Sequence, residues 1–360
     1  MAPISFARGA PSLDIIDVDG LREAAARAFA NDPGGMTAYG TAVGYVPLRR
    51  WIAERHGVDE NQVLVTNGSM QADAFLFDEL VGAGDSVVVE RPSYDRTLLS
   101  LRGHGAALTA IALESDGIDT DALQRALVDG LRPKLAHIIP NFHNPAGYTL
   151  SRPKRERLLL LAREYGFVIF EDDPYIALRF RGESLPTMLS LDAGAGNVVY
   201  ASSFSKTVCP GIRVGFLIGP PDLIARIVVR ATNTYISPSM VDAAIVYEFC
   251  ASGAIERSIE RVRGALQERV GALATALGEE IPGASFVAPD GGYFLWVSLP
   301  DGLEPAAVLK AASAAGVALV SGDDFVLDGG SGAVRLAFSG VTPAEIREGV
   351  TRLAAALRSL

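Results

Sequence analysis

Short apolar segments alternate with longer segments of helical periodicity between residues 60 and 220, and this alternation constrains the fold more than any other feature of the sequence. The short segments are rich in Val and Ile and form continuous apolar runs, which is typical of strands buried on both faces of a sheet. They cover residues 63–66, 86–90, 136–139, 167–170, 198–201 and 215–218. The pattern predicts βαβ units and a mostly parallel sheet in an α/β domain.

Helical segments lie between these strands, and the last third of the chain has a different texture. Helices are expected over 70–80, 152–165 and 221–230, and the second has Ser151 as its N-cap and Pro153 in its first turn. Two long helices over 241–251 and 254–277 come next, followed by short strands at 293–297, 317–320 and 334–338 and a helix over 343–357. This order predicts a second lobe of α+β type.

The charge balance and the cysteine content argue against several classes of protein. Lys and Arg number 32 against 42 Asp and Glu, a net charge of −10 without a basic run, so nucleic acid is not the expected partner. Cys209 and Cys250 form no zinc-binding pattern, so we expect no metal, and their number fits a reducing compartment such as the cytoplasm. No signal peptide and no run of roughly 18 apolar residues is found, so we expect no membrane association.

Common cofactor and nucleophile motifs are missing, which weakens the case for a nicotinamide enzyme, a nucleotide-binding protein or a serine hydrolase. Instead, polar segments follow the ends of predicted strands, where open α/β sheets bind ligands. The densest, residues 202–215, contains Lys206 together with Ser203, Ser205 and Arg213. Hydroxyls and a guanidinium suit a phosphate, and an amine beside a phosphate suits a Schiff-base cofactor. The alternative is a solvated loop lysine.

Other polar residues have a structural and a functional interpretation side by side. Asp172 ends a buried strand, while Asp173 is the better candidate for a carboxylate that caps a solvated turn. The backbone N–H groups of Ser69, Met70 and Gln71 open a helix and could bind phosphate, and Ser69 could equally be an N-cap. Arg335 lies between apolar strand residues, a costly position unless it meets an anion, either a ligand or a structural partner.

The segment around Lys206 resembles the lysine motif of fold-type I pyridoxal phosphate (PLP) enzymes, specifically the class I/II aminotransferases. The subgroup most similar in its motifs contains α-aminoadipate and aromatic aminotransferases and the effector domains of MocR-type regulators. Six further motifs match in order along nearly the whole chain. The resemblance implies a large α/β/α domain with a mostly parallel, mixed sheet over residues 32–252 and a small α+β domain from residues 1–31 and 253–360.

The resemblance also implies a role for each matched residue. Lys206 would bind PLP covalently, Asp172 would pair with the ring nitrogen, and Arg335 would bind the substrate α-carboxylate as a fork. The remaining cofactor contacts would be made by Tyr175 and Asn144 at the phenolic oxygen, Tyr94 on the ring face, and Ser69, Met70, Gln71, Ser203, Ser205 and Arg213 at the phosphate. Tyr39 would reach the phosphate of a neighbouring subunit, so a homodimer with shared sites is expected.

Three departures from the family pattern concern the substrate. Arg8 stands in Phe6-Ala-Arg-Gly9, where relatives commonly have Phe-Ala-Gly-Gly, and Asp323 and Asp324 stand near the expected pocket mouth. Arg8 is expected either to bind a substrate side-chain carboxylate or to pair with one of these acids. Relatives of the α-aminoadipate type also carry a longer N-terminal cover, so we do not expect their specificity to carry over.

The function predicted from these motifs is a PLP-dependent aminotransferase that moves an amino group from an L-amino acid to a 2-oxo acid with ping-pong kinetics. A PLP-dependent lyase that eliminates at Cβ is the alternative on the same fold, because the initial proton abstraction is shared. A non-catalytic amino-acid sensor is the alternative from another class.

Overall fold

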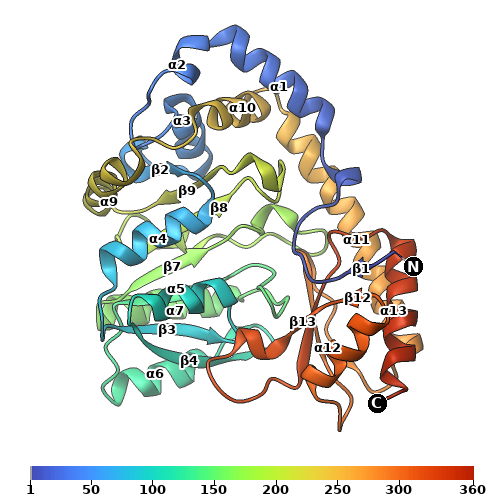
Figure 1. Cartoon of the computed structure of the whole chain (residues 1–360). Helices are drawn as coiled ribbons and strands as arrows, with labels where there is room; N and C mark the ends of the chain where they lie inside the picture. The colour runs from blue at the N-terminus through green and yellow to red at the C-terminus, as the bar shows by residue number, and fades with distance from the viewer. Residues whose placement is uncertain (1) are drawn as a thin grey trace.

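The computed structural model describes residues 2–360 and contains two lobes, each built around its own sheet (Figure 1). The first lobe has an eight-stranded sheet in the order β2-β9-β8-β7-β6-β3-β4-β5. Its strands are β2 (Val63–Thr66), β3 (Ser86–Arg91), β4 (Ala107–Glu114), β5 (Gly117–Ile118), β6 (Leu135–Ile138), β7 (Val168–Asp172), β8 (Val198–Ser203) and β9 (Gly215–Ile218). Neighbours from β4 to β8 are parallel, whereas β9 is antiparallel to both β2 and β8. The predicted mixed, mostly parallel sheet is therefore confirmed.

The predicted strands of this sheet are found, two with the predicted ends and the others with ends that differ by one or two residues. β7 starts at Val168 and runs through Asp172, so Glu171 and Asp172 belong to a fully buried strand end. Burial of Glu171 is possible because its two carboxylate oxygens accept the backbone N–H groups of Met188 and Leu189, each at 2.8 Å. Strands β4 and β5 were not predicted from the sequence. Strand β4 is largely exposed or half-buried, so it lacks the continuous apolar run that marks the other strands.

Helices cover both faces of this sheet. One face is covered by α4 (Ser69–Leu80), α5 (Asp95–Gly103) and α9 (Pro221–Tyr235), and the other by α6 (Thr120–Val128), α7 (Arg152–Tyr165) and α8 (Met188–Asp192). Gly68 rather than Ser69 is the N-cap of α4, with a φ of 84° that a glycine adopts without strain. Ser151 is the N-cap of α7, as predicted, although its hydroxyl makes no capping hydrogen bond. The result is the predicted α/β/α layering.

A third cluster of helices completes the first lobe. It consists of α1 (Val18–Asn31), α2 (Pro33–Thr37), α3 (Val46–His56) and α10 (Met240–Ala251), which share an apolar core with residues of β2, β8 and β9. Long helix α11 (Ala254–Glu280) then runs from this cluster into the second lobe (Figure 1). Within residues 2–360, no helix combines the length and the apolar character needed to cross a bilayer.

The second lobe combines the C-terminal part of the chain with its N-terminal strand. An antiparallel sheet has the order β10-β11-β14-β13, from strands β10 (Ser285–Phe286), β11 (Phe294–Ser298), β13 (Val320–Ser321) and β14 (Ala333–Ala337). Strand β1 (Ile4–Ser5) pairs in parallel with β12 (Val317–Ala318), and helices α11, α12 (Pro305–Ala314) and α13 (Pro343–Leu357) pack with them around one apolar core. Both chain ends therefore lie in this lobe (Figure 1).

Candidate active site

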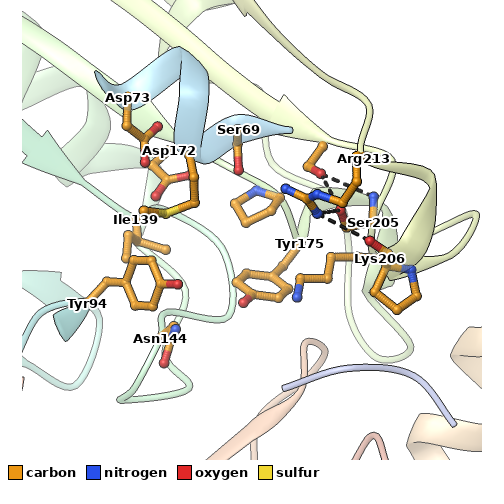
Figure 2. A pocket seen from close by; sticks show the side chains of 14 residues that line it. Ser69, Asp73, Tyr94, Ile139, Asn144, Asp172, Tyr175, Ser205, Lys206 and Arg213 are labelled. Atoms are coloured by element: carbon orange, nitrogen blue, oxygen red, sulfur yellow. Dashed lines mark hydrogen bonds between the residues drawn. The ribbon is translucent and has the colours of Figure 1, made fainter. Parts of the chain in front are cut away.

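A cavity of about 190 Å³ lies at the carboxyl ends of the parallel strands (Figure 2). Segments that follow β2, β3, β6, β7 and β8 meet there, which is where ligands bind in sheets of this kind. The lining residues are Ser69, Met70, Asp73, Tyr94, Ile139, Asn144, Asp172, Pro174, Tyr175, Ser203, Ser205, Lys206, Pro210 and Arg213. Most of the residues singled out in the sequence are thus brought together. Gln71, Tyr39, Arg8 and Arg335 are not part of this lining.

One end of the cavity is a cluster of hydrogen-bond donors. The Ser203 hydroxyl donates to Ser205 Oγ at 2.9 Å, and Arg213 Nη1 donates to the same oxygen at 3.2 Å. A Cβ on Gly68 would lie 2.2 Å from Arg213 Nη2, and a Cβ on Gly215 would lie 2.5 Å from the Ser69 nitrogen. Gly68 therefore lets the Arg213 guanidinium approach the N-terminus of α4 closely, and Gly215 does the same for the backbone of β9. Hydroxyls, a guanidinium and a helix N-terminus in one place suit a phosphate group.

Gln71 lies just inside α4 and is used within the helix. Its backbone N–H donates to Gly68 O at 3.2 Å, and its side-chain oxygen accepts the N–H of Asn67 at 2.9 Å. The contribution of this segment to the cavity therefore comes from Ser69 and Met70.

Lys206 extends from the segment after β8 into the cavity. Its Nζ donates to Gly9 O at 2.8 Å and lies 5.3 Å from the ring centre of Tyr293 and 5.8 Å from that of Tyr175. Burial, assisted by the charges of Arg213 and Arg335, lowers the pKa of Lys206 to about 8. Because a larger fraction of such an amine is uncharged near neutral pH than of an ordinary lysine, Lys206 is suited to act as a nucleophile and as a base.

Asp172 lies at the opposite end of the cavity from Arg213 (Figure 2). It is 5% exposed, and its Oδ2 is 3.3 Å from Nε2 of the fully buried His137. A carboxylate held in this way suits a cationic nitrogen of a ligand. Burial raises the pKa of the nearby Tyr175 hydroxyl well above its ordinary value and that of Tyr94 to about 12, so both remain hydrogen-bond donors.

Asp173 does not lie in a solvated turn, in contrast to the expectation from the sequence. Its side chain is completely buried, and its Oδ2 accepts a hydrogen bond of 2.8 Å from Asn141 Nδ2. Arg155, also buried, donates to Asn141 Oδ1 at 2.8 Å and to three backbone carbonyl oxygens. The sequence prediction for Asp173 was wrong because two successive carboxylates at a strand end point to opposite sides of the sheet, and here both sides are buried.

Arg335 lies on β14 and reaches toward the cavity from the second lobe. Nη1 donates to Asn144 Oδ1 at 2.9 Å and Nη2 to Ala7 O at 2.7 Å, while Nε is buried without a partner. Its guanidinium carbon lies 4.4 Å from the ring centre of Phe294 and 4.8 Å from that of Phe325. No carboxylate in residues 2–360 forms an ion pair with Arg335, so the structural ion pair considered above is not found.

Arg8 and the two acids at 323 and 324 do not pair within the described part of the chain. Asp323 Oδ1 instead accepts hydrogen bonds from the backbone N–H and hydroxyl of Ser331, at 2.8 Å and 3.0 Å. Arg8 is half-buried between Ala7 and Gly9, the residues whose carbonyls bind Arg335 and Lys206. Tyr39 is 91% exposed and lies away from the cavity of its own chain.

Sequence reasoning missed several residues of the site. Asp73 is the most distinctive of them, because it places a second carboxyl group in the cavity. It follows Ser69 by four residues, so the helical repeat could have indicated that it faces the same way. His137 was included in a predicted strand, but its partner Asp172 is 35 residues away in sequence, and no local pattern connects them.

Comparisons with known proteins agree with this geometry. The family described as Aminotransferase class I and II matches residues 3–353. A 2-aminoadipate transaminase of Thermus thermophilus is 35% identical over 99% of this chain and 90% of its own length. Aromatic-amino-acid aminotransferase 1 of Thermococcus litoralis is 31% identical over 99% of this chain and 88% of its own. Among solved structures, α-aminoadipate aminotransferase from Thermus thermophilus, complexed with N-(5'-phosphopyridoxyl)-L-leucine, has a TM-score of 0.94 and 34% identity, covering 99% of this chain and 92% of that one.

Proposed function

This chain belongs to the class I and II aminotransferases and is a PLP-dependent enzyme that moves an amino group between amino acids and 2-oxo acids, and from that premise we propose that it works by a ping-pong cycle centred on Lys206. The observation that carries the proposal is the position of the Lys206 amine, in one cavity with a cluster of phosphate-type donors and with the Asp172 carboxylate. A PLP molecule needs these three groups together.

The residues of the cavity fit the cofactor group by group. The phosphate would be held by the Ser203 and Ser205 hydroxyls, the Arg213 guanidinium and the N-terminus of α4, where a Cβ on Gly68 or Gly215 would leave no room. Asp172 would face the ring nitrogen. The Tyr175 hydroxyl and the Asn144 amide would donate to the phenolic oxygen, and Tyr94 would stack on the ring.

The chemistry is divided between the cofactor and the chain. When bound, PLP supplies an aromatic ring that accepts the electron pair left at the substrate Cα. Lys206 Nζ removes the Cα proton and later returns a proton, a task suited to its lowered pKa. Arg335 holds the substrate α-carboxylate by Nη1 and Nη2, in place of Asn144 Oδ1 and Ala7 O, and so orients the Cα–H bond toward Lys206.

A substrate scan tests this proposal against the alternatives. Purified enzyme is offered acidic, aromatic and aliphatic L-amino acids, together with serine and cysteine, which carry a leaving group on Cβ. The acceptors are several 2-oxo acids other than pyruvate, and ammonia and pyruvate are monitored in parallel. Transamination predicts that product oxo acid and product amino acid form in equal amounts without ammonia. Release of ammonia with pyruvate would identify a Cβ-eliminating lyase. Spectral changes on binding without any product would identify a sensor.

The substrate we propose is an L-amino acid with an acidic or aromatic side chain, in line with the names of the two similar enzymes. Arg335, which lies between the Phe294 and Phe325 rings, recognises only the α-carboxylate common to all candidates. Selection among side chains must therefore come from other residues, and Arg8 is the charged candidate.

We also propose a homodimer in which Tyr39 of one protomer serves the phosphate site of the other. Its 91% exposure and its distance from the cavity of its own chain support this, since an exposed tyrosine is available to a second subunit. The test is a mixed dimer of Tyr39→Phe and Lys206→Ala chains. Shared sites predict that the mixed dimer regains activity, because one of its two sites then contains an intact Tyr39 and an intact Lys206. No gain on mixing, or an active monomer, would contradict the sharing.

The domain division and location are further parts of the proposal. We propose a large domain of residues 32–252 and a small one of residues 1–31 and 253–360, a division supported by the two sheets and by the separate apolar core of the second lobe. Helix α1, which falls in the small domain by these bounds, shares its apolar core with the first lobe. Helix α1 packs on α10 and so connects the two. A cytoplasmic location fits Cys209 and Cys250, which are both unpaired thiols. Amino acids and 2-oxo acids, rather than nucleic acid, are the proposed partners.

A further inference from the structure

Asp73 is a buried carboxyl group that the mechanism above does not use. It lies on α4, one helical turn after Ser69, and lines the cavity although it is only 3% exposed. Its Oδ1 is buried and has no hydrogen-bond partner within residues 2–360. Native proteins rarely leave a buried polar oxygen without a hydrogen bond. We therefore expect this oxygen either to have a hydrogen-bond partner or to be protonated.

Asp172 lines the same cavity, and Figure 2 shows the two carboxyl groups beside each other at one end of it. Burial first, and then repulsion by Asp172, raise the pKa of Asp73 well above its ordinary value. Two negative charges in a site closed to water are costly, so a neighbouring pair of carboxyl groups tends to keep one proton. Burial first, and then the charges of Asp95, Asp172 and Asp73, raise the pKa of Tyr94 to about 12, so that its hydroxyl adds no further negative charge.

The two carboxyl groups differ in their other contacts. Asp172 Oδ2 lies 3.3 Å from His137 Nε2, and because His137 Nδ1 has no partner in the described chain, Nε2 is assigned as the N–H donor. A hydrogen bond of this kind favours the ionised form of the acceptor. Asp73 receives no side-chain donor. The proton therefore belongs on Asp73, and the negative charge on Asp172.

We propose that Asp73 and Asp172 hold one proton between them at neutral pH, that Asp73 carries it, and that Asp73 is a positioning residue for Asp172. The Asp73 hydroxyl would donate to Asp172 and fix its orientation, leaving a single negative charge to face the cofactor ring nitrogen. This inference rests on the proposed role of Asp172. It goes beyond that role because it assigns the proton to the buried Asp73 and gives Asp73 the function of orienting Asp172.

Infrared spectra of the PLP-loaded enzyme at pH 7 test where the proton is. Wild type is compared with Asp73→Asn and Asp73→Leu, and Asp121→Asn, which changes an exposed carboxylate on α6, is the control. We expect both Asp73 variants to lose the carbonyl absorption of one neutral carboxyl group, and the control to keep it. If that absorption is the same in Asp73→Asn as in wild type, Asp73 is ionised and the proposal fails.

The affinity for PLP tests the positioning role. The amide of Asp73→Asn can still donate to Asp172, so the dissociation constant of PLP should stay within about 2-fold of wild type. Asp73→Leu has no donor and should bind PLP about 10-fold more weakly, because a loss of this size corresponds to one hydrogen bond to a charged group. Equal affinities in wild type and a folded Asp73→Leu, or equal losses in both variants, would contradict it. If Asp73→Leu fails to fold, the infrared comparison with Asp73→Asn still decides the inference.

Asp172→Asn separates the two proposals. If this variant binds PLP and turns over like wild type, the assigned role of Asp172 is wrong, whatever the infrared spectra of the Asp73 variants show. If Asp172→Asn is impaired but Asp73→Asn retains the neutral carboxyl absorption, the proposed function stands and only the inference of a shared proton is contradicted.

Discussion

Two regions of the active site, the phosphate end of the cavity and the substrate end around Arg335 next to the cavity, are built in different ways. The phosphate end comes from residues 68–69 and 203–215, all in the first lobe, and its groups hydrogen-bond to one another: Ser203 to Ser205, and Arg213 to Ser205. The substrate end is assembled from three distant segments, because Arg335 on β14 meets Asn144 and the backbone of Ala7. One end is set by a single lobe, and the other depends on how the lobes and the N-terminal segment come together.

The N-terminal segment is what joins the two ends. Ala7 O accepts a hydrogen bond from Arg335 and Gly9 O accepts one from Lys206, so two residues of one short segment contact the arginine proposed to bind the carboxylate and the lysine proposed to react. A Cβ on Gly9 would lie 2.3 Å from Phe294 Cζ, so the segment fits only without a side chain there. In the proposed binding mode, the substrate carboxylate replaces the Ala7 and Asn144 oxygens at Arg335. We infer that the cofactor end is formed in advance and the substrate end rearranges on binding.

Lys206→Ala should give the largest effect and should separate chemistry from cofactor binding. Without the amine at Nζ, no group is placed to move the Cα proton, so turnover should fall at least ~10³-fold. The phosphate end is independent of Lys206, so PLP should still bind, measurably by ultrafiltration. Turnover close to wild type would remove Lys206 from the mechanism.

Asp172→Asn should come next, with a fall in kcat of about 10²-fold, because the charge facing the ring nitrogen is lost while the phosphate contacts remain. PLP occupancy and kcat are measured on the same preparation. A loss of occupancy equal to the loss of rate would mean that Asp172 mainly holds the cofactor.

Asp173→Asn is the matched control, and its expected effect is on stability. It weakens a buried hydrogen-bond network with Asn141 and Arg155, at a cost of about 1–3 kcal/mol in the free energy of unfolding. The rate of the folded enzyme should change little. Chemical denaturation measures the first quantity and steady-state kinetics the second. A large rate loss with unchanged stability would exchange the roles assigned to Asp172 and Asp173.

Arg335→Lys should raise KM by about 10-fold for every amino donor, because lysine cannot form the two parallel hydrogen bonds to an α-carboxylate. Acidic, aromatic and aliphatic donors are compared under the same conditions. An effect confined to one class of donor would show that Arg335 binds side chains instead.

Arg8→Gly should have the smallest effect and is the most selective test of the substrate end. If the guanidinium contacts the substrate side chain, KM for glutamate or aminoadipate should rise by a few-fold, because one exposed ion pair is lost. KM for leucine and phenylalanine should not change. Equal changes for acidic and neutral donors would mean that Arg8 only supports the segment between Ala7 and Gly9.

The sequence predicted the phosphate end better than the substrate end, for a physical reason. Continuous apolar strands such as 198–201 locate the sheet, and the polar residues after the parallel strands meet at its carboxyl edge. Arg213 reaches the same edge from the start of β9, because β9 runs antiparallel to β8. The proximity of Ala7, Asn144 and Arg335 depends instead on the docking of two lobes, which no local periodicity records. Asp173 and Asp73 were misjudged or missed, because burial of a carboxyl group depends on partners far away in sequence.

Reduction of the PLP-loaded enzyme with borohydride, followed by digestion and mass spectrometry, tests the central claim most directly. Reduction fixes the cofactor to the amine that holds it and removes the visible absorption band of the bound cofactor. The account predicts the label on Lys206, whose amine lies in the cavity with Arg213 and Asp172. A label on Lys134, Lys154 or Lys310, or none at all in the fully loaded enzyme, would contradict it.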